Sequence, residues 1–133
     1  DALQTKPQLV KKAQTAFNAF IRARDYGKPC ISCDKPFDPA PNTTDAGHFR
    51  SVSSAVNMRF VEWNCWGQCK NCNTYLAGNV LEYRKRLLKR IGEKELELLE
   101  NDNVLRKYTK DGLIEIARHY NAEARRLNKE RLD

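Results

Sequence analysis

The sequence has no apolar run close to the roughly 20 residues that a transmembrane helix needs, so insertion into a bilayer is excluded. Its first residues, DALQTKPQLVKK, lack the apolar stretch of a secretory signal, and nothing in them directs export. They also lack an initiator Met, which indicates a truncated or processed chain. We therefore expect a protein that has no membrane partner and stays in the cytoplasm.

Acidic residues are also in short supply, with 17 Asp and Glu against 24 Lys and Arg. The formal net charge is +7 and the pI is near 9.3, so a polyanion is the natural partner to consider. The excess is concentrated in residues 6–28 and 82–90, each of which holds five or six bases beside one acid. This concentration indicates that the basic residues bind nucleic acid and do not serve only to keep the surface solvated.

Helical periodicity is clear at both ends of the chain. Residues 7–25 carry one apolar stripe, with Pro7 in the first turn and Gly27 beyond the end. Helices are also expected over about 93–131, a short one over EKELELLE and a longer one from about Thr109. A length of 133 residues fits one domain. We therefore predict a single domain over 1–133 of the α+β class, mostly helical.

The middle of the chain has a different pattern. A proline-rich loop follows the first helix, and its order must come from something other than a buried stripe. Residues 43–50 and 58–63 are rich in β-branched and aromatic types, so two strands joined by the loop SVSSAVN are expected. A helical pattern then returns. If Gly78 interrupts it, Asn79 and Glu82 would cap a fresh helix.

The cysteines form two matched C-x-x-C knuckles, and each can present two thiolates to a tetrahedral zinc ion that needs four. We predict one structural zinc ion, which would also order the loop, bound by Cys30, Cys33, Cys69 and Cys72. Two disulfides or a thioredoxin-like redox pair are the alternatives. Disulfides are disfavoured because nothing exports the chain, and a redox motif does not account for two matched pairs. Cys65 is left as an unpaired, buried thiol.

A histidine and two asparagines accompany these knuckles: His48 in DAGH, Asn64 before QCKNC, and Asn73 directly after the last cysteine. The order Cys-x-x-Cys, His, Asn, Cys-x-x-Cys-Asn resembles the zinc-bearing HNH endonucleases, whose ββα-metal fold holds a catalytic cation between a hairpin and a helix. The resemblance implies a zinc-stabilised ββα-metal core over about 28–91. It also implies that His48 is the general base, Asn64 a bracing residue and Asn73 a metal ligand.

The stretches CISC, AGHFR, RFVEWN, QCKNCN, LAGN and EYR narrow this resemblance. Over most of the chain they look like the phage NinG family, also called Rap. Members of that family act in phage recombination and cleave branched DNA such as Holliday junctions and D-loops with a divalent cation. The resemblance implies the same substrate class and a cytoplasmic location in a bacterial host. Symmetric cutting of a four-way junction needs two active sites, so a homodimer is expected.

The residues themselves suit nuclease chemistry. Phosphodiester hydrolysis needs a base for water and a cation for the charge on the phosphate. Histidine, with a pKa of about 6.5, is largely neutral near pH 7, which suits His48 to the first task. Asp45 and Asn73 offer hard oxygen ligands for Mg²⁺ or Mn²⁺. Many HNH enzymes carry an acid where this chain has Gly47. Asp45 lies on the same strand face as position 47, so it could reach the ion in place of that acid. Gly47, which has no side chain, would let the backbone or a phosphate approach closely.

Each role has a plain structural alternative. Asp45 could be a solvated turn residue, His48 a histidine bonded within the hairpin or a metal ligand, and Asn73 a helix N-cap. Asn64 could hydrogen-bond a strand end. The rival function is a zinc-stabilised module that binds DNA or RNA without cutting it. A third hypothesis keeps the enzyme and makes ordinary duplex DNA its substrate.

Four basic residues are expected to contact DNA. Arg50 would share a strand face with His48 and could clamp a phosphate or make an ordinary backbone contact. Lys85, Arg86 and Lys89 lie on the predicted helix away from its apolar stripe. Basic residues in that position are either solvated or bound to the DNA backbone, and their proximity to the candidate site favours DNA binding.

Overall fold

The computed structural model describes residues 3–133, and its first helix, α1, spans Lys6–Arg24. The helix begins with a capping box in which the side chains of Thr5 and Gln8 each accept a hydrogen bond from the other residue's amide. Pro7 lies in the first turn, as predicted. The bounds differ by one residue at each end from the predicted helix, and the buried face is the apolar stripe seen in the sequence.

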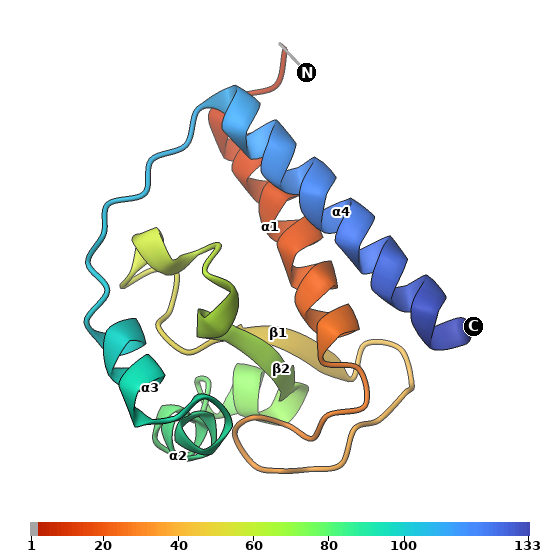
Figure 1. Ribbon diagram of the computed structural model, residues 1–133, viewed down its shortest axis with the longest axis vertical. Helices are drawn as coiled ribbons and strands as arrows, with labels where there is room; N and C mark the ends of the chain where they lie inside the picture. The colour runs from red at the N-terminus through yellow and green to blue at the C-terminus, as the bar shows by residue number, and fades with distance from the viewer. Residues whose placement is uncertain (1–2) are drawn as a thin grey trace.

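Helix α4, Lys110–Leu132, lies beside α1 and runs in the same direction (Figure 1). The Thr109 hydroxyl caps it by accepting a hydrogen bond from the Gly112 amide at 3.0 Å. Where the two helices meet, the rings of Phe17 and Tyr120 pack edge to face with centroids 5.0 Å apart. The predicted final helix is confirmed, and it pairs the beginning of the chain with its end.

Two short strands, β1 (Thr44–His48) and β2 (Cys65–Cys69), form one antiparallel pair. Strand β1 lies within the predicted 43–50. The second predicted strand, 58–63, is wrong, because the chain there folds into 3₁₀ turns at Val56–Met58 and Glu62–Asn64.

The local hydrogen bonds explain this difference. The Val61 amide donates to the Met58 carbonyl at 3.2 Å, and the Asn64 amide donates to the Val61 carbonyl at 3.0 Å. Donors used inside a turn are not available to a ladder, so this segment cannot pair as a strand. Its apolar character serves burial instead, since Met58 is fully buried.

A π-helical turn, Asn71–Tyr75, follows β2, and helix α2, Val80–Ile91, begins after a break. Gly78 has a φ of +86°, which glycine adopts without strain, so the predicted interruption is confirmed. The expected cap by the Asn79 side chain is wrong. The Asn79 side chain makes no cap hydrogen bond, and its Nδ2 atom instead donates to the Cys72 sulfur at 3.7 Å.

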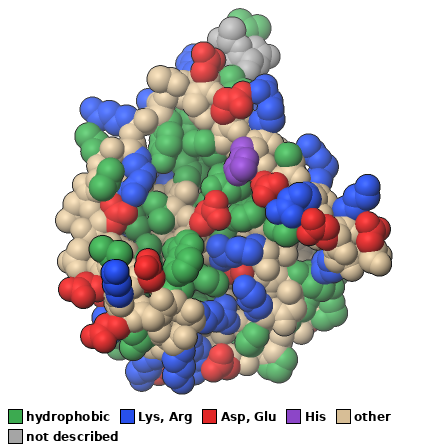
Figure 2. All heavy atoms as spheres, viewed as in Figure 1, with side chains coloured by type: hydrophobic (Ala, Val, Ile, Leu, Met, Phe, Trp, Pro, Cys, Tyr) green, Lys and Arg blue, Asp and Glu red, His purple; other side chains and the backbone are tan. Residues whose placement is uncertain are grey.

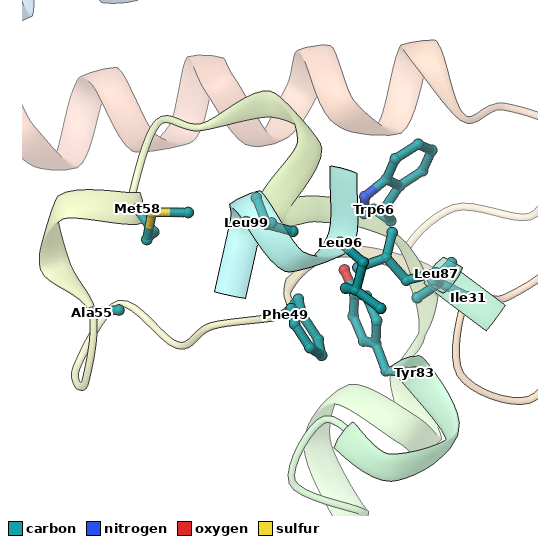
Figure 3. Close-up of a cluster of buried hydrophobic side chains, with 9 residues drawn as sticks. All are labelled: Ile31, Phe49, Ala55, Met58, Trp66, Tyr83, Leu87, Leu96 and Leu99. Carbon is teal, nitrogen blue, oxygen red and sulfur yellow. The ribbon is translucent and has the colours of Figure 1, made fainter. Parts of the chain in front are cut away.

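The hairpin separates two hydrophobic cores. On one face, helices α2 and α3 (Glu93–Glu100, as predicted) cover a cluster in which Phe49, Tyr83 and Leu96 lie together (Figure 3). On the other face, Ala46 and Cys65 pack toward α1 and α4. The order of layers is therefore α4, α1, hairpin, and then α2 with α3. The chain is a mixed, mostly helical α+β protein.

The surface mixes the two signs of charge. On the face drawn in Figure 2, basic and acidic side chains are interspersed. Many of them are paired, for example Arg84 with Glu100 at 2.7 Å and Arg126 with Glu123 at 3.0 Å. Among the residues that the structure describes, no helix is long and apolar enough to span a bilayer.

Candidate metal centre and its surroundings

The four predicted zinc ligands come together, with their sulfur atoms all within 4.8 Å of one another: Cys30, Cys33, Cys69 and Cys72. The sulfurs of Cys33 and Cys69 are 3.8 Å apart. Zinc–sulfur bonds of about 2.3 Å in a tetrahedron place the sulfurs about 3.8 Å apart, so the cluster has the size that zinc requires. All five cysteines of the chain are free, which disfavours the disulfide alternative. The cluster could hold one zinc ion.

Hydrogen-bond donors surround the buried sulfurs. The amides of Ser32 and Cys69 each lie 3.3 Å from the Cys30 sulfur, and the Asn79 side chain donates to that of Cys72. Such donors stabilise thiolate ligands. Burial raises the pKa of the Cys30 and Cys72 thiols. Metal binding must therefore release protons.

Asp45 and Asn73 also meet, as the predicted cation site requires. The Asn73 Nδ2 atom donates to Asp45 Oδ2 at 2.9 Å, which leaves the Asn73 Oδ1 oxygen as a further acceptor. Lys70 forms an ion pair with the other oxygen of Asp45. Lys70 was not predicted as a site residue. It directly follows β2, in which Gln68 pairs with Asp45. Asn73 is not a helix cap, because it lies inside the π-helical turn.

His48 lies on the opposite face of β1. Its Nε2 atom is 3.0 Å from the Arg59 carbonyl oxygen, its Nδ1 atom is 3.8 Å from the Cys65 sulfur, and its ring stacks near Phe17. Burial lowers the pKa of His48, so the ring is neutral at pH 7. In the described part of the chain, no hydrogen bond links His48 to Asp45. The structure therefore brings together Asp45 and Asn73, the two predicted oxygen ligands, and it shows His48 bonded to the loop between the strands.

Gly47 is in close contact with a side chain. A Cβ atom at this position would lie 1.9 Å from Gln68 Oε1, and Tyr83 donates to the Gly47 carbonyl at 2.6 Å. The expected approach of backbone or phosphate at Gly47 is thus wrong, because the Gln68 side chain fills that space. Gln68 was not predicted as an important residue, because the strand that contains it was not predicted, and the structure shows it fully buried.

Asn64 closes the loop between the strands. It is fully buried, its Oδ1 atom accepts from the Arg50 amide at 2.9 Å, and its Nδ2 atom donates to the Arg50 carbonyl at 3.0 Å. These contacts fit both the predicted bracing role and its alternative, a residue that hydrogen-bonds the end of a strand. The Arg50 guanidinium donates to the carbonyl oxygens of Leu99 and Asp102, so this side chain links the loop to the end of α3. A DNA contact by Arg50 stays a prediction.

The basic residues of α2 do not form one outward row. Arg86 is half-buried, and it donates to the Asp34 carboxylate at 2.9 Å and to Glu82 at 3.0 Å. The expectation that Arg86 faces away from the molecule is therefore wrong, since it binds the loop of the first knuckle. Lys85 pairs with Glu82 at 3.2 Å, and Lys89 is exposed. Among these three, Lys89 is the most open to a phosphate.

A family comparison agrees with the resemblance of the sequence. The model of the family described as "Bacteriophage Lambda NinG protein" matches residues 1–130. The chain belongs to the NinG family. Curated relatives named "Protein ninG" include that of Escherichia phage lambda, 35% identical over 130 residues, and that of Salmonella phage P22, 36% identical over the same length.

These matches cover 98% of this NinG-family chain and 62% of the lambda protein or 63% of the P22 protein. A third relative, from Enterobacteria phage H19B, is 38% identical over 108 residues, which is 81% of this chain and 52% of its own length. The chain thus spans less than two thirds of these relatives. No solved structure matches it.

Proposed function

We propose that this chain is a divalent-metal-dependent, structure-specific DNA endonuclease that cleaves branched recombination intermediates such as Holliday junctions and D-loops. The observation that best supports the proposal is the Asp45–Asn73 pair, held 2.9 Å apart beside four cysteines that fit zinc. The net charge of +7 suits a polyanionic substrate. The proposal includes a ββα-metal core over about 28–91 and action in the cytoplasm of a bacterial host.

Each residue has a stated task in this proposal. Asp45 and the Oδ1 atom of Asn73 would hold Mg²⁺ or Mn²⁺, and the ion would supply neutralisation of charge on the phosphate and the departing oxygen. Lys70, the ion-pair partner of Asp45, would contact the phosphate. His48 accepts the proton of the attacking water. If its Nε2–H donates to the Arg59 carbonyl, Nδ1 is the basic nitrogen, and the lowered pKa keeps the ring unprotonated.

The rival proposal is a zinc-stabilised module that binds DNA or RNA and does not cut it. A specific observation favours it: His48 and Asp45 lie on opposite faces of β1, and Nδ1 of His48 faces the buried sulfur of Cys65. The nuclease proposal requires the His48 ring to turn toward the substrate when DNA binds. The rival requires no such change.

A synthetic mobile four-way junction with Mg²⁺ or Mn²⁺ distinguishes the two. The chain has two histidines, so His119→Ala is a matched control for His48→Ala; His119 is exposed on α4. We expect the junction to be cut by wild type and His119→Ala, and His48→Ala to be about 10² to 10⁴ times slower with unchanged binding. Equal cleavage by His48→Ala would show that the base is assigned wrongly.

Two further results test the rival binding module and the choice between branched and ordinary duplex DNA as substrate. Tight, salt-sensitive junction binding with no nicking in any divalent ion would support the binding module. Equal rates on branched and linear DNA of matching sequence would support ordinary duplex as the substrate. Paired cuts in one junction require two active sites, so we also propose a homodimer, which sedimentation of the DNA-bound protein tests.

A further inference from the structure

A hollow of about 230 Å³ lies between the long loop that follows α1 and strand β2. In Figure 1 this loop leaves the lower end of α1 and curves round to β1. We call the space the lysine hollow, after the three lysines that line it: Lys28, Lys35 and Lys70. Of the residues given a phosphate contact above, Lys70 lines it, whereas Arg50, Lys85, Arg86 and Lys89 do not.

The lysine hollow is lined by three lysines and by two kinds of negative group, the carboxylate of Asp38 and the zinc-site thiolates of Cys30 and Cys69. Lys28 lies 3.4 Å from Asp25, but that carboxylate is already held by two hydrogen bonds from Arg24, so the charge of Lys28 is not cancelled. Lys35 is exposed, and within the described residues its ammonium group forms no ion pair. Lys70 is paired with Asp45, so Lys28 and Lys35 are the ammonium groups available to a ligand. A phosphate is the ligand group that suits them.

The remaining lining suits a nucleobase. Phe37 lines the hollow, and its ring packs against that of Tyr26 with the centroids 4.4 Å apart. The carboxamides of Asn42 and Asn71 also line it, and within the described residues neither side chain has a hydrogen-bond partner. Aromatic faces stack on bases, and a carboxamide offers both a donor and an acceptor to a base edge.

Size and position narrow the ligand further. A volume of about 230 Å³ lies below the roughly 300 Å³ at which sites for drug-sized molecules begin, so the hollow is too small for a duplex and takes at most one unpaired base and its phosphate. Lys70 lines the hollow and also forms the ion pair with Asp45. Lys70 therefore connects the hollow to the Asp45–Asn73 pair.

We infer that the lysine hollow binds one unpaired nucleotide of a DNA strand at a branch, next to the linkage that is cut. Lys28 and Lys35 hold its phosphate, Phe37 stacks on its base, and the two asparagines meet the base edge. This inference rests on the proposed function, and it gives a reason for preferring branches, since a fully paired duplex offers no free base. Selection would then depend on strand structure more than on base sequence.

Equilibrium binding of the zinc-loaded chain without Mg²⁺ or Mn²⁺ tests the inference. The probes are two labelled DNAs of the same sequence, a duplex with a short single-stranded flap and the fully paired form. Wild type should bind the flap DNA about tenfold more tightly. Phe37→Leu, which keeps an apolar side chain against Tyr26, and Asn71→Ala should lose most of that preference. Inorganic phosphate alone should compete weakly.

Charge gives an independent readout. Lys35→Ala should lower the salt dependence of flap binding by about 0.7 in log–log slope, the value for one contact with a single strand. Lys110→Ala removes the same charge from an exposed position at the start of α4, and it should leave the flap preference unchanged. Melting curves confirm that each variant is folded.

The failures of the two proposals can be told apart. Flap preference that survives in Asp45→Ala while cleavage is lost supports both. Flap preference that depends on Phe37 in a protein that never cuts overturns the nuclease and keeps the nucleotide site. Equal binding of flap and paired DNA by wild type, or a flap preference unchanged in Phe37→Leu, Asn71→Ala and Lys35→Ala, overturns the nucleotide site alone.

Discussion

Gly47→Ala should destabilise the protein strongly, even though it adds one methyl group. The new Cβ would lie 1.9 Å from Gln68 Oε1 and 3.0 Å from its Cβ, so Gln68 has to move. Gln68 is fully buried, and its Nε2 atom donates to Ser32 Oγ at 2.8 Å and to the Gly78 carbonyl at 2.7 Å. Movement of this side chain therefore breaks two buried hydrogen bonds.

The magnitude follows from these contacts. Each buried hydrogen bond contributes about 1 kcal/mol, and overpacking a well-filled interior costs about 1 to 3 kcal/mol. We expect Gly47→Ala to lower the free energy of unfolding by about 3 to 5 kcal/mol. Because Ser32 belongs to the first zinc knuckle, the variant should also release zinc more readily. Urea denaturation and a chromophoric zinc chelator measure the two effects.

A double-mutant cycle supplies the control. Gln68→Ala removes the atoms that clash, so adding Gly47→Ala to it should cost at least about 1 kcal/mol less than adding it to wild type. The reasoning would be refuted by a single Gly47→Ala change that costs under about 1 kcal/mol, or by strictly additive effects of the two substitutions.

Three other predictions concern titratable groups. Burial raises the pKa of Asp25, but hydrogen bonds and charge from Arg24 outweigh this effect, so the net pKa is lowered. Asp25→Asn should lower the free energy of unfolding by about 3 kcal/mol. In acid titrations the variant should lose less stability than wild type below about pH 4, because it lacks the carboxylate that must be protonated. Because burial lowers the pKa of His48, junction cleavage should fall only below about pH 6.5, and a flat pH–rate profile there would argue against His48 as the base. Cys30→Ser should abolish zinc retention and cooperative melting. Because burial raises the pKa of the Cys72 thiol, wild type should lose zinc as the pH falls, and chelator competition measures this loss.

The helices and the cysteine cluster could be predicted because their signals are local or countable. The apolar spacing in 7–25 gave α1 to within one residue at each end, and four cysteines in two pairs match a four-ligand ion. The strand β2 could not be found in this way. Its sequence, CWGQC, contains glycine and glutamine, which have little preference for strands. Its place is set by tertiary bonds, such as the one from the Gly67 amide to Asp25 at 2.8 Å.

The candidate site was partly predictable for the same reason. Residues 45 and 47 share a strand face by simple alternation, and Asn73 follows a knuckle that fixes its position, so the Asp45–Asn73 contact was expected. Arg86 was misjudged because helical spacing describes one helix alone. The loop of the first knuckle folds over that face of α2 and gives Arg86 a partner in Asp34, a contact 52 residues apart in sequence.

The pairing of α1 with α4 has a consequence for synthesis on the ribosome. Helix α1 is synthesised well before α4, which covers Phe17 and Phe20. Until α4 has left the ribosome, the nascent chain must therefore carry an uncovered apolar helix face. Slow translation or early termination within α4 would leave an aggregation-prone product.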